Sequence, residues 1–169
     1  MTDPTAATAA PEGQPAHVVR VHERIADVPR AVWDRFAGTS RASGAAYNPF
    51  MRHDFLSALE EAGCAIADTG WHGQHLVLED GGGNALAAAP AYLKAHSQGE
   101  YVFDHAWADA WERAGGRYYP KLQLSVPFTP ATGPRLLIGP DVNAEAARAA
   151  LADAIAQLTE RLGLSSAHV

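Results

Sequence analysis

Two apolar runs joined by a glycine-rich connection constrain the fold of this chain most. The runs are His75 to Glu79 and Ala85 to Lys94, and the connection reads Asp80-Gly-Gly-Gly-Asn84. Glycine adopts positive φ without steric penalty, so such a connection lets an extended chain reverse its direction. The pattern predicts an antiparallel hairpin. Pro90 cannot donate a backbone hydrogen bond, so we expect a bulge or an edge position there.

Start signals and apolar spacing predict three of the four helices expected in this chain. Asn143 to Leu162 is the clearest, with Glu145 in the first turn, Arg161 in the last and Gly163 after it. Its apolar stripe comprises Ala147, Leu151, Ala154, Ile155, Leu158 and Leu162. Two further helices begin at start signals that contain proline. They are a short helix that starts at Asp27-Val-Pro29 and runs through Trp33 and Phe36, and one from Asn48-Pro49 to Ala62 with Met51, Phe55 and Leu59 on one face.

The remaining segments complete a mixed α/β order. Residues 17–25, 99–103, 121–126 and 165–169 are strand-like, and Asp104 stands where it can cap a helix that runs to Gly115. The fold class expected from this order is α/β, with a mixed, mostly antiparallel sheet flanked by helices.

Composition limits the classes of function. With 169 residues, 47% of them apolar, the chain has room for one domain, which we place at 17–169 behind a disordered Ala/Pro/Thr/Gly-rich tail at 1–16. A formal net charge of -6 leaves no basic field for counterion release, so we expect no nucleic acid binding by this chain. No apolar run approaches the roughly 20 residues that cross a bilayer. With a single cysteine, Cys64, these features favour a cytoplasmic location without a membrane span.

The run from Tyr92 to Gly139 is the candidate functional segment. It mixes aromatic with ionisable and proline residues in an order that fits neither helical nor strand periodicity. Rings in such a segment can line a groove while charged side chains supply polar contacts. The candidate substrate-binding residues are Asp104, Trp107, Trp111, Tyr118, Tyr119, Lys121 and Arg135, and the candidate catalytic residue is His105.

Each candidate has a structural alternative. Trp107 and Trp111 are four residues apart, a spacing that is more often core than ligand platform. For Asp104 a helix cap is the more frequent role, and His105 is either a general base for an attacking amine or a structural histidine. Arg135 either forks onto a carboxylate or phosphate of the acceptor or pairs with an acidic neighbour.

Other constellations carry less chemistry. His72 and His75 are three apart, which in a strand places them on opposite faces, so no metal site is expected. Cys64 has no local base to activate its thiol. Glycines 81–83 lie between two strands with no helix after them, so they form a turn and not a phosphate loop.

Several local sequences resemble the FemAB-like family of the GNAT (N-acetyltransferase) superfamily. They are Asn48-Pro-Phe50, Tyr92-Leu-Lys94, Gly99-Glu-Tyr-Val-Phe-Asp104, Trp107-Ala-Asp-Ala110, Arg117-Tyr-Tyr-Pro-Lys121, Val126-Pro-Phe-Thr-Pro130 and Thr132-Gly-Pro-Arg-Leu136. The resemblance implies a GNAT-like N-terminal domain, truncated before its last strand, whose parent adds a second, C-terminal GNAT half. It further implies transfer of an acyl or aminoacyl group to an amine acceptor such as a cell-wall peptide. The implied donor for the parent is acyl-CoA or aminoacyl-tRNA.

One part of the resemblance can be tested against the residues. A GNAT domain holds the pyrophosphate of acyl-CoA on a glycine-rich turn at a helix N-terminus. Here the corresponding stretch, 103–110, has no glycine and carries two carboxylates, so we expect no cofactor bound by this half and an inactive isolated chain. The rival interpretations are a non-catalytic module that recognises a peptide or glycan, and a structural half that packs on the missing domain.

Overall fold

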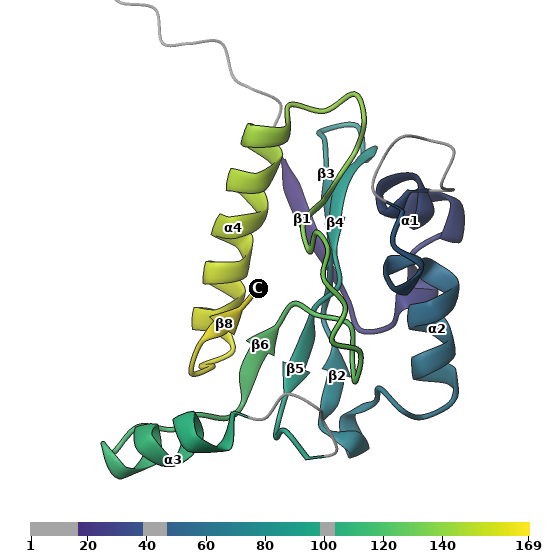
Figure 1. The fold of residues 1–169 in the computed structure, drawn as a ribbon. Helices are drawn as coiled ribbons and strands as arrows, with labels where there is room; N and C mark the ends of the chain where they lie inside the picture. Colours follow the sequence, from purple (N-terminus) through teal and green to yellow (C-terminus); the bar gives the residue numbers. More distant parts are fainter. Residues whose placement is uncertain (1–16, 39–46, 99–103) are drawn as a thin grey trace, which may run out of the picture.

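The computed structural model describes residues 17–38, 47–98 and 104–169. In these residues the chain forms a mixed α/β fold with two four-stranded sheets, ordered β1-β3-β4-β7 and β2-β5-β6-β8 (Figure 1). The strands are β1 (Val18–His22), β2 (Trp71–Gly73), β3 (His75–Glu79), β4 (Ala85–Ala89), β5 (Tyr92–Lys94), β6 (Lys121–Gln123), β7 (Leu137–Ile138) and β8 (Ala167–His168). The α-helices are α1 (Arg30–Ala37), α2 (His53–Glu61), α3 (His105–Arg113) and α4 (Ala144–Arg161).

The predicted hairpin is confirmed, and it runs through both sheets. β3 pairs with β4 and β2 with β5, both antiparallel and in one continuous register, since Leu76 faces Ala89 and Gly73 faces Tyr92. At the tip, the Asp80 carboxylate accepts hydrogen bonds from the backbone N–H of Gly82 and Asn84. Gly83 has φ +80, a conformation that glycine adopts without strain.

Pro90 does not form the bulge that was one of the two roles expected for it. The register is unchanged across it, because the Gln74 N–H still donates to the Ala91 carbonyl at 2.8 Å. The bulge lies instead between Leu78 and Glu79. The second neighbour of the strand changes at Pro90. Before this residue β4 pairs with β7, and after it β5 pairs with β6. The single sheet that was expected is therefore divided into two at this point.

Helices cover both faces of the first sheet (Figure 1). Successive strand residues point to opposite faces. Val77 and Ala88 accordingly pack in one cluster with Trp33 of α1 and Leu56 of α2. Leu76, Leu78, Ala87 and Ala89 pack in the other with the α4 stripe of Ala147, Leu151, Ile155 and Leu158. The stripe was predicted from spacing, although its last member, Leu162, is exposed.

The helix starts agree with the sequence in part. The Asn143 side chain caps α4 by accepting from the Ala146 N–H, and the Asn48 side chain accepts from the Phe50 N–H. The helix expected from Asn48 to Ala62 is broken, because Arg52 is extended between a 3₁₀ turn, η3 (Pro49–Met51), and α2.

Asp34 of α1 supplies the missing start of α2. Its carboxylate accepts from the His53 N–H at 3.0 Å and from Arg52 at 2.6 Å. The start predicted for the first helix was also wrong, because Pro29 occupies the cap position of α1 itself and Asp27 lies in the preceding 3₁₀ turn, η1 (Ile25–Asp27).

Several strands differ from expectation in length. The predicted strands 17–25, 121–126 and 165–169 shorten to β1, β6 and β8, and β2 and β7 were not predicted. A further 3₁₀ turn, η4 (Ala67–Thr69), precedes β2. The strand expected at 99–103 and the tail expected at 1–16 lie outside the described residues. β8 pairs with β6 in parallel and is the edge strand of the second sheet.

Candidate functional site

A cavity of about 560 Å³ lies between the second sheet, the start of α3 and the loop that follows β6. Its size lies within the range of small-molecule sites. The lining residues are Trp71, Lys94, Asp104, Trp107, Tyr118, Lys121, Gln123, Ser125, Val126, Phe128, Thr129, Pro130, Arg135 and His168. Three of these carry a positive charge and one a carboxylate, in a chain whose net charge is -6. The charged side chains that line the cavity are therefore net positive, whereas the chain as a whole is net negative.

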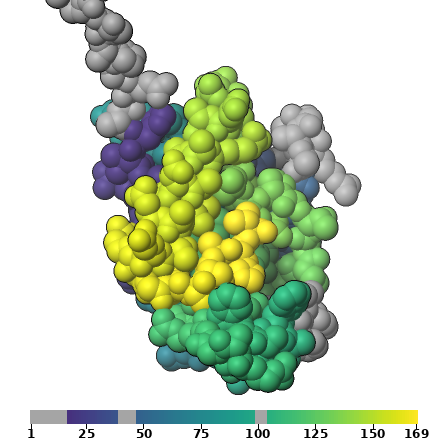
Figure 2. Space-filling view, turned by 90° about the vertical axis from the view of Figure 1, so that its left-hand side faces the viewer, coloured from purple at the N-terminus to yellow at the C-terminus, as the bar shows by residue number. Residues whose placement is uncertain are grey.

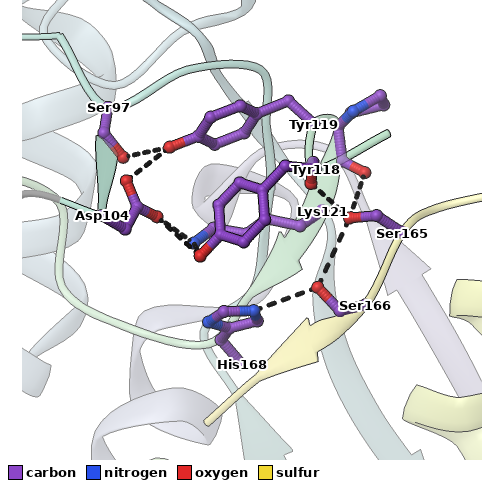
Figure 3. Close-up of polar contacts among 9 residues, drawn as sticks. Ser97, Asp104, Tyr118, Tyr119, Lys121, Ser165, Ser166 and His168 are labelled. Atoms are coloured by element: carbon purple, nitrogen blue, oxygen red, sulfur yellow. Dashed lines mark hydrogen bonds and ion pairs between the residues drawn. The ribbon is translucent and has the colours of Figure 1, made fainter. Parts of the chain in front are cut away.

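Asp104 is the polar centre of this cavity (Figure 3). Its carboxylate accepts from the Lys121 ammonium at 2.5 Å, from the Tyr119 hydroxyl at 2.5 Å and from the Tyr118 hydroxyl at 3.2 Å. The Ser97 hydroxyl is 2.5 Å from that of Tyr119. Asp104 occupies the cap position of α3, but its side chain makes no cap hydrogen bond. The expected cap role was wrong, because the lysine and tyrosines bind this carboxylate instead.

These donors decide the charge state of Asp104. Partial burial alone raises the pKa of a carboxyl group, but the hydrogen bonds from Lys121, Ser97 and Tyr119 outweigh it, so the pKa of Asp104 lies well below its usual value. For Tyr119, burial and the neighbouring carboxylate raise the pKa well above the usual value. The carboxylate is therefore ionised and the phenol protonated throughout the physiological range.

Two buried lysines lie side by side on the sheet. Lys94 of β5 and Lys121 of β6 are partners in the strand register, and each residue is only 2% exposed. Residues directly opposite each other on neighbouring strands point to the same face. The Lys94 ammonium lies 4.6 Å from the centre of the Trp71 ring, and that of Lys121 lies 4.8 Å from the Tyr118 ring. Burial, only partly offset by Asp104, lowers the pKa of Lys94 to about 8.

The C-terminal strand, β8, forms another wall of the cavity. His168 of β8 lies with its ring edge-on to Tyr118, and its Nε2 is 3.0 Å from the Ser166 hydroxyl (Figure 3). The Ser165 hydroxyl donates to the Tyr118 carbonyl and so fastens β8 to the segment before β6. Burial and the charge of Lys121 lower the pKa of His168, so the imidazole is neutral at pH 7.

Arg135 lines the cavity but is held by its own loop. One guanidinium nitrogen donates to the Ala131 carbonyl at 2.6 Å and another to the Gly133 carbonyl at 3.0 Å. The sequence suggested that Arg135 binds either an acidic neighbour or a carboxylate or phosphate of the acceptor. Both of these hydrogen bonds instead go to backbone carbonyl groups. The side chain fixes the proline-rich loop, and its charge adds to that of the two lysines.

Helix α3 carries the two exposed tryptophans. It projects at one end of the molecule, and Figure 2 shows it below the C-terminal residues. Trp107 is 74% exposed and Trp111 55%, so neither is a core residue. Trp107 lines the cavity, whereas Trp111 lies outside it against Gly116, where an added Cβ would be 2.2 Å from the indole nitrogen. His105 is exposed and is not part of the cavity lining.

The structure thus brings together most of the residues predicted from sequence. Asp104, Trp107, Tyr118, Lys121 and Arg135 line the cavity, and Tyr119 reaches it through Asp104, whereas Trp111 and His105 do not line it. The sequence did not identify four lining residues that strand pairing and the loop after β6 bring to the cavity. They are Trp71, Lys94, Phe128 and His168. One signal was available: Lys94 ends an apolar run in which a lysine is unusual.

The described ranges contain neither a metal-binding cluster nor a membrane-spanning helix. These residues contain no group of three or more His, Cys, Asp or Glu side chains placed to hold a metal ion. Of the two histidines that stood out in the sequence, His75 Nε2 lies 2.8 Å from Glu60 and His72 Nε2 lies 3.6 Å from Glu23. No helix in the described parts is both long and apolar enough to traverse a bilayer.

Comparison with known proteins defines the class. The model of the FemAB-like family, described as peptidoglycan biosynthesis/recognition, matches residues 24–169. The chain belongs to the FemAB-like family. No curated protein and no solved structure matches it. The family match covers all the residues that line the cavity.

Proposed function

We propose that the cavity is the acceptor side of an acyl or aminoacyl transfer reaction in peptidoglycan biosynthesis. The observation that carries this proposal is a cavity with a partly buried Lys121–Asp104 ion pair and an exposed Trp107 at its border, in a chain of the FemAB-like family. Buried ion pairs are expensive to assemble and are often found where a ligand has to be oriented. The acceptor would be a cell-wall peptide that carries the attacking amine.

The chemistry requires orientation more than a nucleophile from the protein. The acceptor amine attacks the carbonyl of a thioester or ester, a C–N bond forms, the C–S or C–O bond breaks, and the amine loses a proton. The cavity would hold the acceptor, while a second GNAT-like half of a longer parent would hold acyl-CoA or aminoacyl-tRNA. The start of α3 supports this division, because it has no glycine and Asp104 lies at its cap position. We place the reaction in the cytoplasm, where both donors are made.

The base that removes the proton is not assigned to the cavity lining. His105, the candidate from sequence, is adjacent to Asp104 but exposed and outside the lining. In this proposal His105 acts as the general base only if the donor half covers it. The chain by itself would then bind the acceptor and catalyse no transfer.

A recognition module is the second candidate function. The 74% exposure of Trp107 beside the cavity favours it, because exposed tryptophans are common platforms for sugar rings and peptides. Such a module would bind the same peptide without any transfer. A structural half, whose α3 packs on another domain, would bind none.

Binding of a cell-wall stem peptide, followed by isothermal titration calorimetry, tests the proposal. Ser125→Tyr narrows the cavity and should weaken binding at least tenfold, while Ala152→Tyr, on the exposed face of α4, should leave it unchanged. If neither variant loses binding, the cavity is not the binding site. Mass spectrometry of the peptide after incubation with the longer parent and each donor then separates transfer from recognition.

A further inference from the structure

We infer that His168 is the proton acceptor of the transfer reaction, through the Nδ1 atom of its imidazole ring. This inference rests on the proposed function and deepens it, because that proposal assigns no base to the cavity lining. His168 is the last residue of β8 and lines the cavity, whereas His105 does not. The inference is carried by the place of the ring in the cavity wall and by the direction of its hydrogen bond.

A chain of hydrogen bonds fixes which ring nitrogen carries the proton (Figure 3). The single hydroxyl hydrogen of Ser165 is donated to the backbone carbonyl oxygens of Tyr118 and Pro120. The Ser165 oxygen can then only accept, and its donor is the Ser166 hydroxyl, 3.4 Å away. Ser166 in turn accepts from Nε2 of His168 at 3.0 Å. Because a neutral imidazole has one donor and one acceptor nitrogen, Nδ1 keeps its lone pair.

The ring presents this lone pair to the cavity. His168 lines the cavity but Ser166 does not, so the part of the ring turned away from Ser166 faces the ligand. Figure 3 shows Nδ1, the second ring nitrogen, on that side. The ring also lies edge-on to Tyr118, with 6.1 Å between the ring centres, and the Tyr118 hydroxyl donates to Asp104. An acceptor amine held in the cavity therefore meets the basic nitrogen of His168.

The other ionisable groups of the lining are poorer proton acceptors. The pKa of Asp104 lies well below its usual value, so its carboxylate is a weak base, and it already accepts from Lys121 and Tyr119. Lys121 takes part in that contact as a donor. Lys94, with a pKa of about 8, already carries a proton on most molecules at pH 7. His168 is the lining side chain whose ordinary chemistry fits a base near neutral pH.

The proton is transferred after the amine has attacked. The lone pair of the amine forms the C–N bond, and one carbonyl electron pair moves onto oxygen. The nitrogen of this adduct is positively charged, and its proton passes to Nδ1 of His168. The carbonyl then forms again, the C–S or C–O bond breaks, and the imidazolium returns the proton to the departing thiolate or alkoxide. Imidazole is too weak a base to deprotonate a free alkylammonium ion efficiently, which places its role at the adduct.

The groups around His168 set the pH range in which it can act. They are Asp104 from the start of α3, Tyr118 from the segment before β6, Lys121 from β6 and Lys94 from β5. Burial and the charge of Lys121 lower the pKa of His168, so the ring is a free base at pH 7. It gains a proton as the pH falls through this pKa, and transfer should slow over the same range.

Nitrogen-15 NMR of the histidine rings tests the tautomer without any substrate. We expect His168 to be neutral at pH 7, with its proton on Nε2 and a pKa below the ordinary value of 6.5. His168→Gln identifies the signals by their loss. Ser166→Ala removes the acceptor of the Nε2 proton and should reduce the share of this tautomer, whereas Ser166→Thr keeps a hydroxyl and should preserve it. A proton on Nδ1, or a charged ring at pH 7, overturns the inference.

Steady-state kinetics of the longer parent test the role itself, with a stem peptide and with acyl-CoA or aminoacyl-tRNA as donor. His168→Gln should lower kcat about hundredfold or more and change KM for the peptide less than about threefold. The wild type should show a break in its plot of log(kcat/KM) against pH at the pKa that NMR gives for His168, and the variant should lack it. His72→Gln is the matched control, because this histidine lies outside the cavity lining, and it should leave kcat unchanged. Circular dichroism confirms that each variant is folded.

The outcomes separate the inference from the proposed function. If the parent transfers the group and His168→Gln keeps both kcat and the break in the pH profile, the proposed function stands and His168 is not the base. An equal fall of kcat without loss of the break assigns His168 a structural role and likewise overturns the inference. If the parent transfers nothing from either donor, the proposed transfer fails and the role of His168 fails with it.

Discussion

Lys94 shows how a single buried charge links stability to pH. Its pKa is lowered to about 8, mainly by burial, whereas in the unfolded chain it has the ordinary value of 10.5. Between these two values the unfolded chain binds more protons than the folded one, so stability rises with pH in that window. Below pH 8 the full destabilisation is present. At pH 7 the charged ammonium group of Lys94 therefore lowers the free energy of unfolding.

Lys94→Met should therefore stabilise the folded chain at pH 7. We expect the free energy of unfolding to rise by about 1–3 kcal/mol, because a buried charge is replaced by an apolar side chain of similar length. The gain should shrink as pH rises from 8 to 10.5. Urea denaturation of the wild type and the variant at pH 7, 9 and 10.5 measures both effects. A variant less stable than the wild type at pH 7 would contradict the assignment.

Asp104 acts in the opposite direction. Its pKa is lowered in the fold, so its stabilisation is complete above the unfolded value of 3.8 and is lost as pH falls towards the folded value. Asp104→Asn leaves the Lys121 charge buried without its carboxylate. We expect a loss of about 2 kcal/mol at pH 7, less than for a fully buried pair because the Asp104 side chain is 19% exposed.

A double-mutant cycle separates the pair from its surroundings. Lys121→Met alone should destabilise the chain, whereas Asp104→Asn combined with Lys121→Met should recover most of either loss. Chemical denaturation of the four proteins at pH 7 gives the coupling free energy. Additive losses would show that Tyr118 and Tyr119, and not Lys121, hold this carboxylate in place.

At the level of elements, α3 separates stability from binding. Trp107 and Trp111 lie one turn apart on it and are both exposed, but only Trp107 lines the cavity. Trp107→Ala should change the free energy of unfolding by less than about 0.5 kcal/mol. It should weaken binding of the stem peptide about tenfold, through loss of a ring contact. Trp111→Ala is the matched control, and an equal effect of both on binding would point to a helix-wide interface.

The same elements show what sequence could and could not predict. Asp104, Tyr118 and Lys121 lie within 18 positions of one another, and their unusual mixture was visible before any fold was known. Trp71, Lys94 and His168 come from β2, β5 and β8, which strand pairing brings to the same place. A pair such as Lys94 and Lys121 exists only through register. Strands of two or three residues, such as β2 and β7, are too short to show a period.

Side-chain competition explains the wrong assignments at helix starts. A carboxylate at a cap position normally binds a backbone N–H. Asp104 has a lysine and two tyrosine donors instead, while Asp34 reaches from α1 to start α2. Sequence spacing shows where a cap is available but not which donors the fold brings to it. Asn143 caps α4 as predicted, whereas Asn48 caps the 3₁₀ turn η3 and not α2.

For the whole molecule, the hairpin is the element that joins the two sheets. β2 continues into β3 through Gln74 alone, and β4 into β5 through Pro90 and Ala91. The Gln74 N–H donates to Ala91, and the pairing is in one register on both sides. Neither sheet can lose its central strands without disturbing the other. The cavity, which lies on the second sheet, thereby depends on the core formed by the first.

This continuity predicts a single cooperative unfolding transition. Trp33 reports on the core between α1, α2 and the first sheet, and Trp71 packs against Tyr92 and Phe128 in the second. With Trp107 and Trp111 replaced by Phe, a further Trp71→Phe or Trp33→Phe change leaves one reporter in either part. We expect the two urea transitions to coincide with each other and with far-ultraviolet circular dichroism. An earlier midpoint for Trp71 would show that the second sheet, and the cavity with it, opens before the core unfolds.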